Sequence, residues 1–209
     1  MNEKHIIKCQ AIIRGFLYRK NQPLSVIKLM KLKSHSIVTK KRKSQLDFYI
    51  ENNASKEILH YVDVPGKTFG EKHMENIARE YFKLDLKKDT AHDHIKLNKK
   101  IEQKSARYNA NGGDWIWQHI EMNHNFDYLL LCGLDFHNIK FFISSRKIIE
   151  QLIESKIITG QGKIKNGTAL PQQGYWFSRN NFKKKGLLFE DYFTEIKNEK
   201  DLILYLNTF

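Results

Sequence analysis

Two strand-like runs, residues 93–97 and 100–106, stand so close together in the chain that only a tight hairpin turn can connect them. A two-residue loop at Leu97–Asn98 is the natural connection, and residues whose numbers sum to 195 then face each other. One such pair consists of two carboxylates, Asp93 and Glu102. Because opposed like charges are destabilising unless a cation lies between them, the hairpin predicts a site for a divalent cation.

The residues that follow Glu102 extend this site. Side chains alternate along a strand, so Lys104 is expected on the same face as Glu102, and Gln103 on the other. Mg²⁺, or Mn²⁺ in its place, takes a few carboxylate oxygens and keeps several waters. Asp93 and Glu102, with the Gln103 carbonyl, would supply those oxygens, and Lys104 would orient or deprotonate an attacking water. These groups predict metal-dependent hydrolysis of a phosphodiester, with either one or two metal ions.

Helices and strands are expected around this hairpin. The patterns predict a helix over about 69–84, strands over 115–122, 127–133 and 138–144, a helix over 146–156 and a terminal helix near 200–206. Residues 46–64 show no regular pattern, and residues 160–174 are rich in glycine. We therefore expect an α/β domain with a central mixed sheet flanked by helices.

The positive charge is concentrated at the N-terminus. Residues 1–43 hold twelve Lys/Arg and one acidic residue, which gives +11 of the total +13, whereas residues 44–209 hold 24 basic and 22 acidic residues. Apolar residues recur at helical spacing over 4–20. We expect a basic helical arm, residues 1–43, that binds nucleic-acid phosphates, joined to a catalytic domain, residues 44–209. A merely solubilising tail is the alternative.

The hairpin residues also resemble a known motif. Asp93, an eight-residue gap and Glu102-Gln103-Lys104 look like the PD-(D/E)XK motif of restriction enzymes, Holliday-junction resolvases and repair nucleases, with His92 in place of the proline. The resemblance implies a restriction-endonuclease-like core over about residues 66–156. It also implies an Mg²⁺-dependent DNA endonuclease in which Asp93, Glu102 and Lys104 are catalytic.

Two further site residues are implied by the same resemblance. A glutamate on the helix before the motif often joins the metal site in these nucleases, which points to Glu75, with Glu71 one turn away as the alternative. A polar residue on the strand after the motif often supports catalysis, which points to Gln118. His119, Asn123 and His124 lack the partners of a zinc-type nuclease site, and we interpret them as polar loop residues.

The N-terminal arm carries a second resemblance. Gln10, Arg14, Gly15 and Arg19 have the spacing of an IQ motif, a basic helix that calmodulin-like proteins bind. A helix of this charge would equally lie along DNA phosphates. The residues expected to contact nucleic acid are Arg14, Arg19, Lys40, Lys41, Arg42, Lys43, Arg179, Lys183, Lys184 and Lys185.

The apolar runs and the cysteines indicate the kind of compartment in which the protein is found. The longest apolar run, 128–134, is much shorter than a membrane-spanning helix, and the N-terminus lacks the apolar core of a signal peptide, so we expect a soluble intracellular protein, cytoplasmic or nuclear, that binds no membrane. Cys9 and Cys132 are expected to be reduced thiols. Double-strand cutting would favour a homodimer. The rival interpretation is a non-catalytic adapter that binds nucleic acid or calmodulin.

Overall fold

The computed structural model describes residues 44–86, 92–110, 112–161, 164–165, 168–169 and 174–208. The chain divides into two units between Lys43 and Ser44, and the description below concerns the second unit. The expected arm helix, its IQ-like residues and the basic run 40–43 lie outside the described residues.

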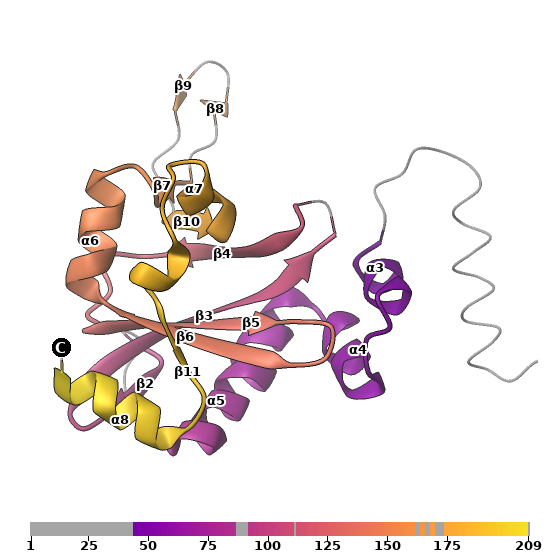
Figure 1. Cartoon of the computed structure of the whole chain (residues 1–209), viewed down its shortest axis with the longest axis horizontal. Helices are drawn as coiled ribbons and strands as arrows, with labels where there is room; N and C mark the ends of the chain where they lie inside the picture. Colours follow the sequence, from indigo (N-terminus) through magenta and orange to yellow (C-terminus); the bar gives the residue numbers. More distant parts are fainter. Residues whose placement is uncertain are drawn as a thin grey trace, which may run out of the picture. The chain divides into compact units, whose positions relative to one another are not determined.

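The second unit begins with helices and continues with strands (Figure 1). The helical elements are α3 (Gln45–Glu51), α4 (Lys56–Val62), the π-helix η1 (Thr68–Met74), α5 (Glu75–Phe82), α6 (Arg146–Glu154), α7 (Arg179–Lys183), the 3-10 helix η2 (Phe189–Asp191) and α8 (Glu199–Thr208). The strands are β1 (Asp85–Leu86), β2 (His94–Lys96), β3 (Lys99–Asn109), β4 (Asp114–Ile120), β5 (Tyr128–Leu134), β6 (Ile139–Ser145), β7 (Thr159–Gly160), β8 (Ile164–Lys165), β9 (Thr168–Ala169), β10 (Tyr175–Ser178) and β11 (Thr194–Ile196).

A central mixed sheet organises these elements, which confirms the expected α/β class. Its strand order is β11-β6-β5-β3-β4-β10-β7, and β1 and β2 join it beside the start of β3. The long strands β3 and β5 run parallel, whereas β5 and β6 run antiparallel. The described pairing of β3 with β4 is confined to Tyr108 and Asn109, so β4 leaves β3 after a short contact and continues beside β10.

The β2–β3 hairpin has the register that the sequence predicts. His94 pairs with Ile101, and Leu97 and Asn98 form the two-residue turn. Both turn residues have left-handed backbone angles, with φ of 51° and 60°, which is the pattern of a type I′ turn. The hairpin is confirmed over His94–Lys96 and residues 99–101, and Asp93, which precedes β2, donates its amide to the Ile101 carbonyl at 3.0 Å.

One face of the sheet packs against helices. In Figure 1, α5 and α8 lie below the β6–β5–β3 layer, and the buried residues Ala78, Phe82 and Leu202 contribute to a core with Ile101 of β3. The Tyr49 hydroxyl of α3 donates to the Leu134 carbonyl at 2.7 Å, and burial raises the pKa of this hydroxyl, so it stays protonated. Helix α3 is thereby fixed to the end of β5.

The other face is covered by β4, β10 and α7 (Figure 1). The buried rings of Trp115, Trp117 and Phe177 form a second core against Leu129 of β5. The Trp115 indole lies on Gly133, where an added Cβ would come within 2.7 Å of the ring. Glycine is therefore required at this position for the close approach of β4 to β5.

The helical expectations agree in part with the structure. The helix predicted over 69–84 is present as η1 followed by α5, and the terminal helix begins at Glu199. The irregular segment 46–64 forms two short helices, each begun by a serine cap: Ser44 accepts from the Asp47 amide and Ser55 from the Ile58 amide. None of the described helices has the length and apolarity needed to cross a membrane.

Candidate functional site

The turn at Leu97–Asn98 brings Asp93 beside the start of β3. The Asp93 amide donates to the Ile101 carbonyl at 3.0 Å, and the Gln103 amide donates to Asp93 Oδ2 at 2.8 Å. Within one strand residue, the N–H and C=O groups point toward the same edge. The Gln103 carbonyl therefore faces the edge on which Asp93 lies, as a shared cation site requires.

Glu102 and Lys104 meet on one face of β3, as alternation predicts. Lys104 Nζ lies 2.7 Å from Glu102 Oε1, and only 3% of the Glu102 side chain is exposed, against 19% for Lys104. A carboxylate so deeply buried needs a charged partner, and Lys104 supplies it. The amine retains contact with solvent, so water can reach it.

A histidine also contacts Glu102. His124 Nδ1 lies 3.3 Å from Glu102 Oε1, and His124 Nε2 lies 3.0 Å from Glu121 Oε2. The imidazole thus connects a buried carboxylate to an exposed one. The interpretation of His124 as an ordinary loop residue missed this contact, because His124 follows Glu102 by 22 positions and belongs to the loop after β4.

Arg146 holds the loop that carries His124. Its guanidinium donates to the His124 carbonyl at 2.7 Å and to the Met122 carbonyl at 2.6 Å, and it lies 4.9 Å from the centre of the Phe126 ring. Two charge-assisted hydrogen bonds and a ring contact restrict the loop. The first residue of α6 therefore positions the imidazole at Glu102.

The Gln103 side chain lies on the opposite face of β3. Its Oε1 is 2.8 Å from His94 Nε2, and its Nε2 donates to Ser105 Oγ at 3.2 Å. Behind them, burial raises the pKa of the Cys132 thiol despite a hydrogen bond from Ser105, so this free cysteine stays protonated. The buried polar contacts hold Gln103 in place beneath Asp93.

The remaining residues implied by the motif belong to other elements of the fold. Helix α5, which begins at Glu75, packs on the face that bears Ile101, whereas Glu102 projects from the other face. Glu71 on η1 is exposed and lies 3.8 Å from Lys67. Gln118 is exposed on β4, which diverges from β3. The structure thus joins Asp93 to Gln103 and Glu102 to Lys104, leaves Glu71 and Gln118 exposed, and places Glu75 at the start of a helix that packs on the face of β3 opposite to Glu102.

The hairpin residues have the chemistry of a hard-cation site, though not a complete set of ligands. Asp93 and Glu102 offer carboxylate oxygens, and the Gln103 carbonyl points to the same edge. Among the described residues, no three His, Cys, Asp or Glu side chains are grouped so that they could hold a metal ion. A cation here would depend on these two carboxylates, a backbone carbonyl and water, which is the kind of ligand set that Mg²⁺ accepts.

A pocket of about 650 Å³ opens next to the hairpin. It is lined by Lys99, Asp127, Tyr128, Ser145, Arg146, Lys147, Ile148, Gln151 and Thr208. Tyr128 pairs with Ile101, the residue before Glu102, so the pocket lies within a few residues of the candidate site. Lys99, Arg146 and Lys147 make its lining mainly basic.

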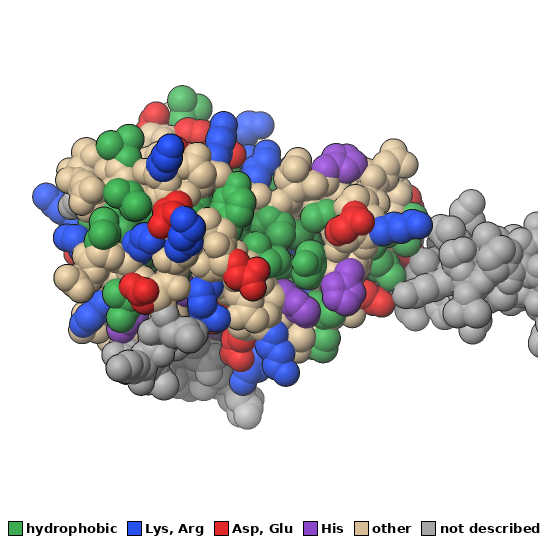
Figure 2. Space-filling model, turned by 90° about the horizontal axis from the view of Figure 1, so that it is seen from below, with side chains coloured by type: hydrophobic (Ala, Val, Ile, Leu, Met, Phe, Trp, Pro, Cys, Tyr) green, Lys and Arg blue, Asp and Glu red, His purple; other side chains and the backbone are tan. Residues whose placement is uncertain are grey.

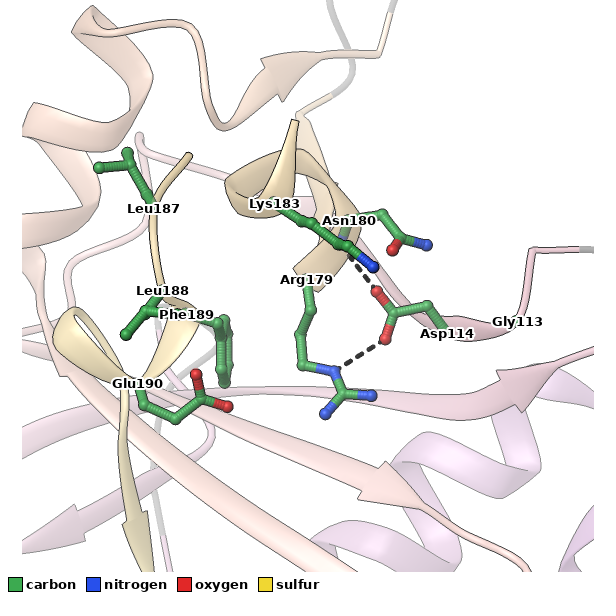
Figure 3. A pocket seen from close by; sticks show the side chains of 9 residues that line it. All are labelled: Gly113, Asp114, Arg179, Asn180, Lys183, Leu187, Leu188, Phe189 and Glu190. Carbon is green, nitrogen blue, oxygen red and sulfur yellow. Dashed lines mark hydrogen bonds and ion pairs between the residues drawn. The ribbon is translucent and has the colours of Figure 1, made fainter. Parts of the chain in front are cut away.

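The predicted nucleic-acid contacts of the C-terminal segment lie on or just after α7. Arg179 Nε donates to Asp114 Oδ1 at 2.9 Å, which ties α7 to the start of β4 (Figure 3). Lys183, Lys184 and Lys185 are exposed. These lysines are therefore accessible to solvent, whereas Arg179 is partly engaged by Asp114.

Comparisons with known proteins add no relative: no family model matches the chain, and neither the curated proteins nor the solved structures give a match.

Proposed function

We propose that this protein is an Mg²⁺-dependent DNA endonuclease with a restriction-endonuclease-like core, and that Asp93, Glu102 and Lys104 form its active site. One observation carries the proposal: the hairpin holds the Asp93 carboxylate on the Gln103 amide, between Glu102 and Lys104 in the sequence, and the buried Glu102 carboxylate lies 2.7 Å from the Lys104 amine. Two carboxylates and an amine close to one another in a hairpin are the groups that metal-dependent phosphodiester hydrolysis needs.

Each residue has a defined part in this reaction. Asp93 and Glu102, with the Gln103 carbonyl, hold the cation, which when bound supplies Lewis-acid activation of water and offsets phosphate charge. Lys104 orients the attacking water and donates toward the negative charge that develops on the phosphate oxygens. His124, held by Glu121, keeps the Glu102 carboxylate in position.

The charge distribution supports a nucleic-acid substrate. The 43 N-terminal residues carry +11, whereas residues 44–209 carry +2. Figure 2 shows one face of the described part, on which Lys/Arg and Asp/Glu side chains are interspersed and do not form a patch of one sign. Non-specific attraction to DNA phosphates would therefore come mainly from the arm, and local lysines would direct the strand.

Cleavage of supercoiled plasmid and of branched DNA, with Mg²⁺ or Mn²⁺ and with EDTA, tests the proposal. The full-length protein should nick DNA only with metal, and Glu102→Gln and Lys104→Met should lose at least a hundredfold in rate while they still bind DNA. Glu195→Gln, an exposed carboxylate on β11, is the matched control and should cleave normally. Metal-independent nicking, or full activity in Glu102→Gln, would refute the assignment.

A non-catalytic adapter that binds nucleic acid or a calmodulin-like protein is the second candidate. The observation that favours it is that Glu102 already has two partners, Lys104 and His124, and that no cluster of three metal-binding side chains exists among the described residues. In that case Lys104 and Glu102 form a structural ion pair. DNA binding without cleavage, combined with no binding of Mn²⁺, would select the adapter.

A further inference from the structure

A second pocket, of about 390 Å³, lies at the opposite end of β3 from the hairpin (Figure 3). Asp114 of β4, Arg179 and Lys183 of α7, and Leu188 and Glu190 near η2 contribute to its walls. Its volume falls in the range of small-molecule sites. The pocket is therefore large enough for a ligand of the size of one nucleotide.

One wall of this pocket is a fixed guanidinium group. Arg179 Nε donates to the buried Asp114 carboxylate at 2.9 Å, and the guanidinium carbon lies 4.6 Å from the centre of the Trp115 ring. The Asn180 amide donates to the second Asp114 oxygen at 2.9 Å. Within the described structure, neither Nη group of Arg179 makes a hydrogen bond, so the outer edge of a pre-positioned donor fork is available to a ligand.

The opposite wall is apolar with one acceptor. Figure 3 shows Leu188, Phe189 and Glu190 across the pocket from Arg179. Leu188 is 65% exposed, and Phe189 has its ring between Trp117 and Phe193. Because both faces of the Phe189 ring are already covered, a ligand would pack against Leu188 and would direct its N–H groups to the Glu190 carboxylate.

The charges of the pocket nearly cancel. Arg179 and Lys183 are positive, and Asp114 and Glu190 are negative. A phosphate dianion gains little from a neutral pocket that contains an acceptor carboxylate. A neutral, planar ligand with hydrogen-bond acceptors along one edge and donors along the next gains more binding free energy. Arg179 can donate to its acceptors, and the Glu190 carboxylate can accept from its donors.

We propose that this pocket binds an unpaired guanine base. Arginine donates two hydrogen bonds to guanine O6 and N7, and the N1–H and N2–H groups on the adjoining edge suit the Glu190 carboxylate. Bases that leave the helical stack are held by such edge contacts and by apolar side chains, here Leu188. Adenine has an amino group where guanine has O6. This donor would face the N–H donors of Arg179, so no hydrogen bond could form there. The inference rests on the proposed function in taking DNA as the partner.

Titration calorimetry of the full-length protein in EDTA with GMP, AMP, CMP and inorganic phosphate tests this inference. GMP should bind saturably and at least tenfold more tightly than the other three. Glu190→Gln and Arg179→Lys should each weaken GMP binding by roughly tenfold or more. Glu195→Gln, an exposed carboxylate outside the pocket, should bind GMP like the wild type.

Equal affinities for the three nucleotides and phosphate would overturn the inference, and so would unchanged GMP binding in folded Glu190→Gln. Because Glu190 is exposed, Glu190→Gln should fold, and its affinity for GMP tests the inference even if Arg179→Lys unfolds. The assay needs neither metal nor cleavage. A failure of the nuclease proposal, seen as absent nicking, is therefore distinguishable from a failure of the guanine pocket, seen as absent GMP binding.

Discussion

Removal of Lys104 should cost more stability than removal of its partner, Glu102. The Glu102 side chain is 3% exposed and that of Lys104 is 19% exposed. Lys104→Ala leaves a buried carboxylate whose remaining contact within the described structure is His124, at 3.3 Å. Breaking a buried pair in this way costs about 3–5 kcal/mol, and we expect about 3 because His124 remains. Glu102→Ala leaves an amine that can reach water, at a cost of about 1–2 kcal/mol.

Urea unfolding of the full-length protein in EDTA measures these differences. Lys104→Ala should be the least stable single variant, and about 3 kcal/mol corresponds to a fall in Tm of roughly 6–12 °C. The double variant should be more stable than Lys104→Ala alone, because the second substitution removes the uncompensated charge. If Glu102→Ala is as destabilised as Lys104→Ala, or if the two effects simply add, the uncompensated charge of Glu102 is not the cause of the loss in stability.

Two further predictions concern the packing at Gly133 and the ion pairs of Glu199. Gly133→Ala would place a Cβ 2.7 Å from the Trp115 ring and should lower the free energy of unfolding by about 1–3 kcal/mol, measured in urea. Hydrogen bonds from Lys83 and Lys96 lower the pKa of the Glu199 carboxyl. The stabilisation is therefore complete above the ordinary glutamate pKa and is lost as pH falls through the lowered value. Glu199→Gln should lower the unfolding midpoint at about pH 7, and this difference from the wild type should shrink as the pH falls below the ordinary glutamate pKa.

The hairpin was predictable because its information is local. Two short strands with two residues between them allow few turns, and the type I′ turn at Leu97–Asn98 fixes the pairing. Alternation then places Glu102 and Lys104 on one face without knowledge of the remaining fold. The order of strand and helix patterns along the chain also predicted a mixed sheet. It did not predict the order of the strands within the sheet, because the parallel pairing of β3 with β5 depends on contacts between residues distant in the sequence.

The residues that surround the site are brought there by tertiary contacts, which the sequence patterns do not predict. His124 reaches Glu102 because Arg146, at the start of α6, holds the intervening loop by its carbonyls. Helices α3 and α4 are seven residues each, too short for a clear periodic signal, and their serine caps were the available clue. The expectation for Glu75 came from resemblance alone, and α5 packs on the face opposite to Glu102.

A Mn²⁺ titration of the full-length protein, followed by electron paramagnetic resonance of the free ion, reports whether Asp93 and Glu102 together hold a divalent cation. We expect saturable binding in the wild type and in Glu195→Gln, and at least a tenfold loss of affinity in both Asp93→Asn and Glu102→Gln. Equal Mn²⁺ affinity in all four proteins, or no binding in any of them, would contradict this expectation.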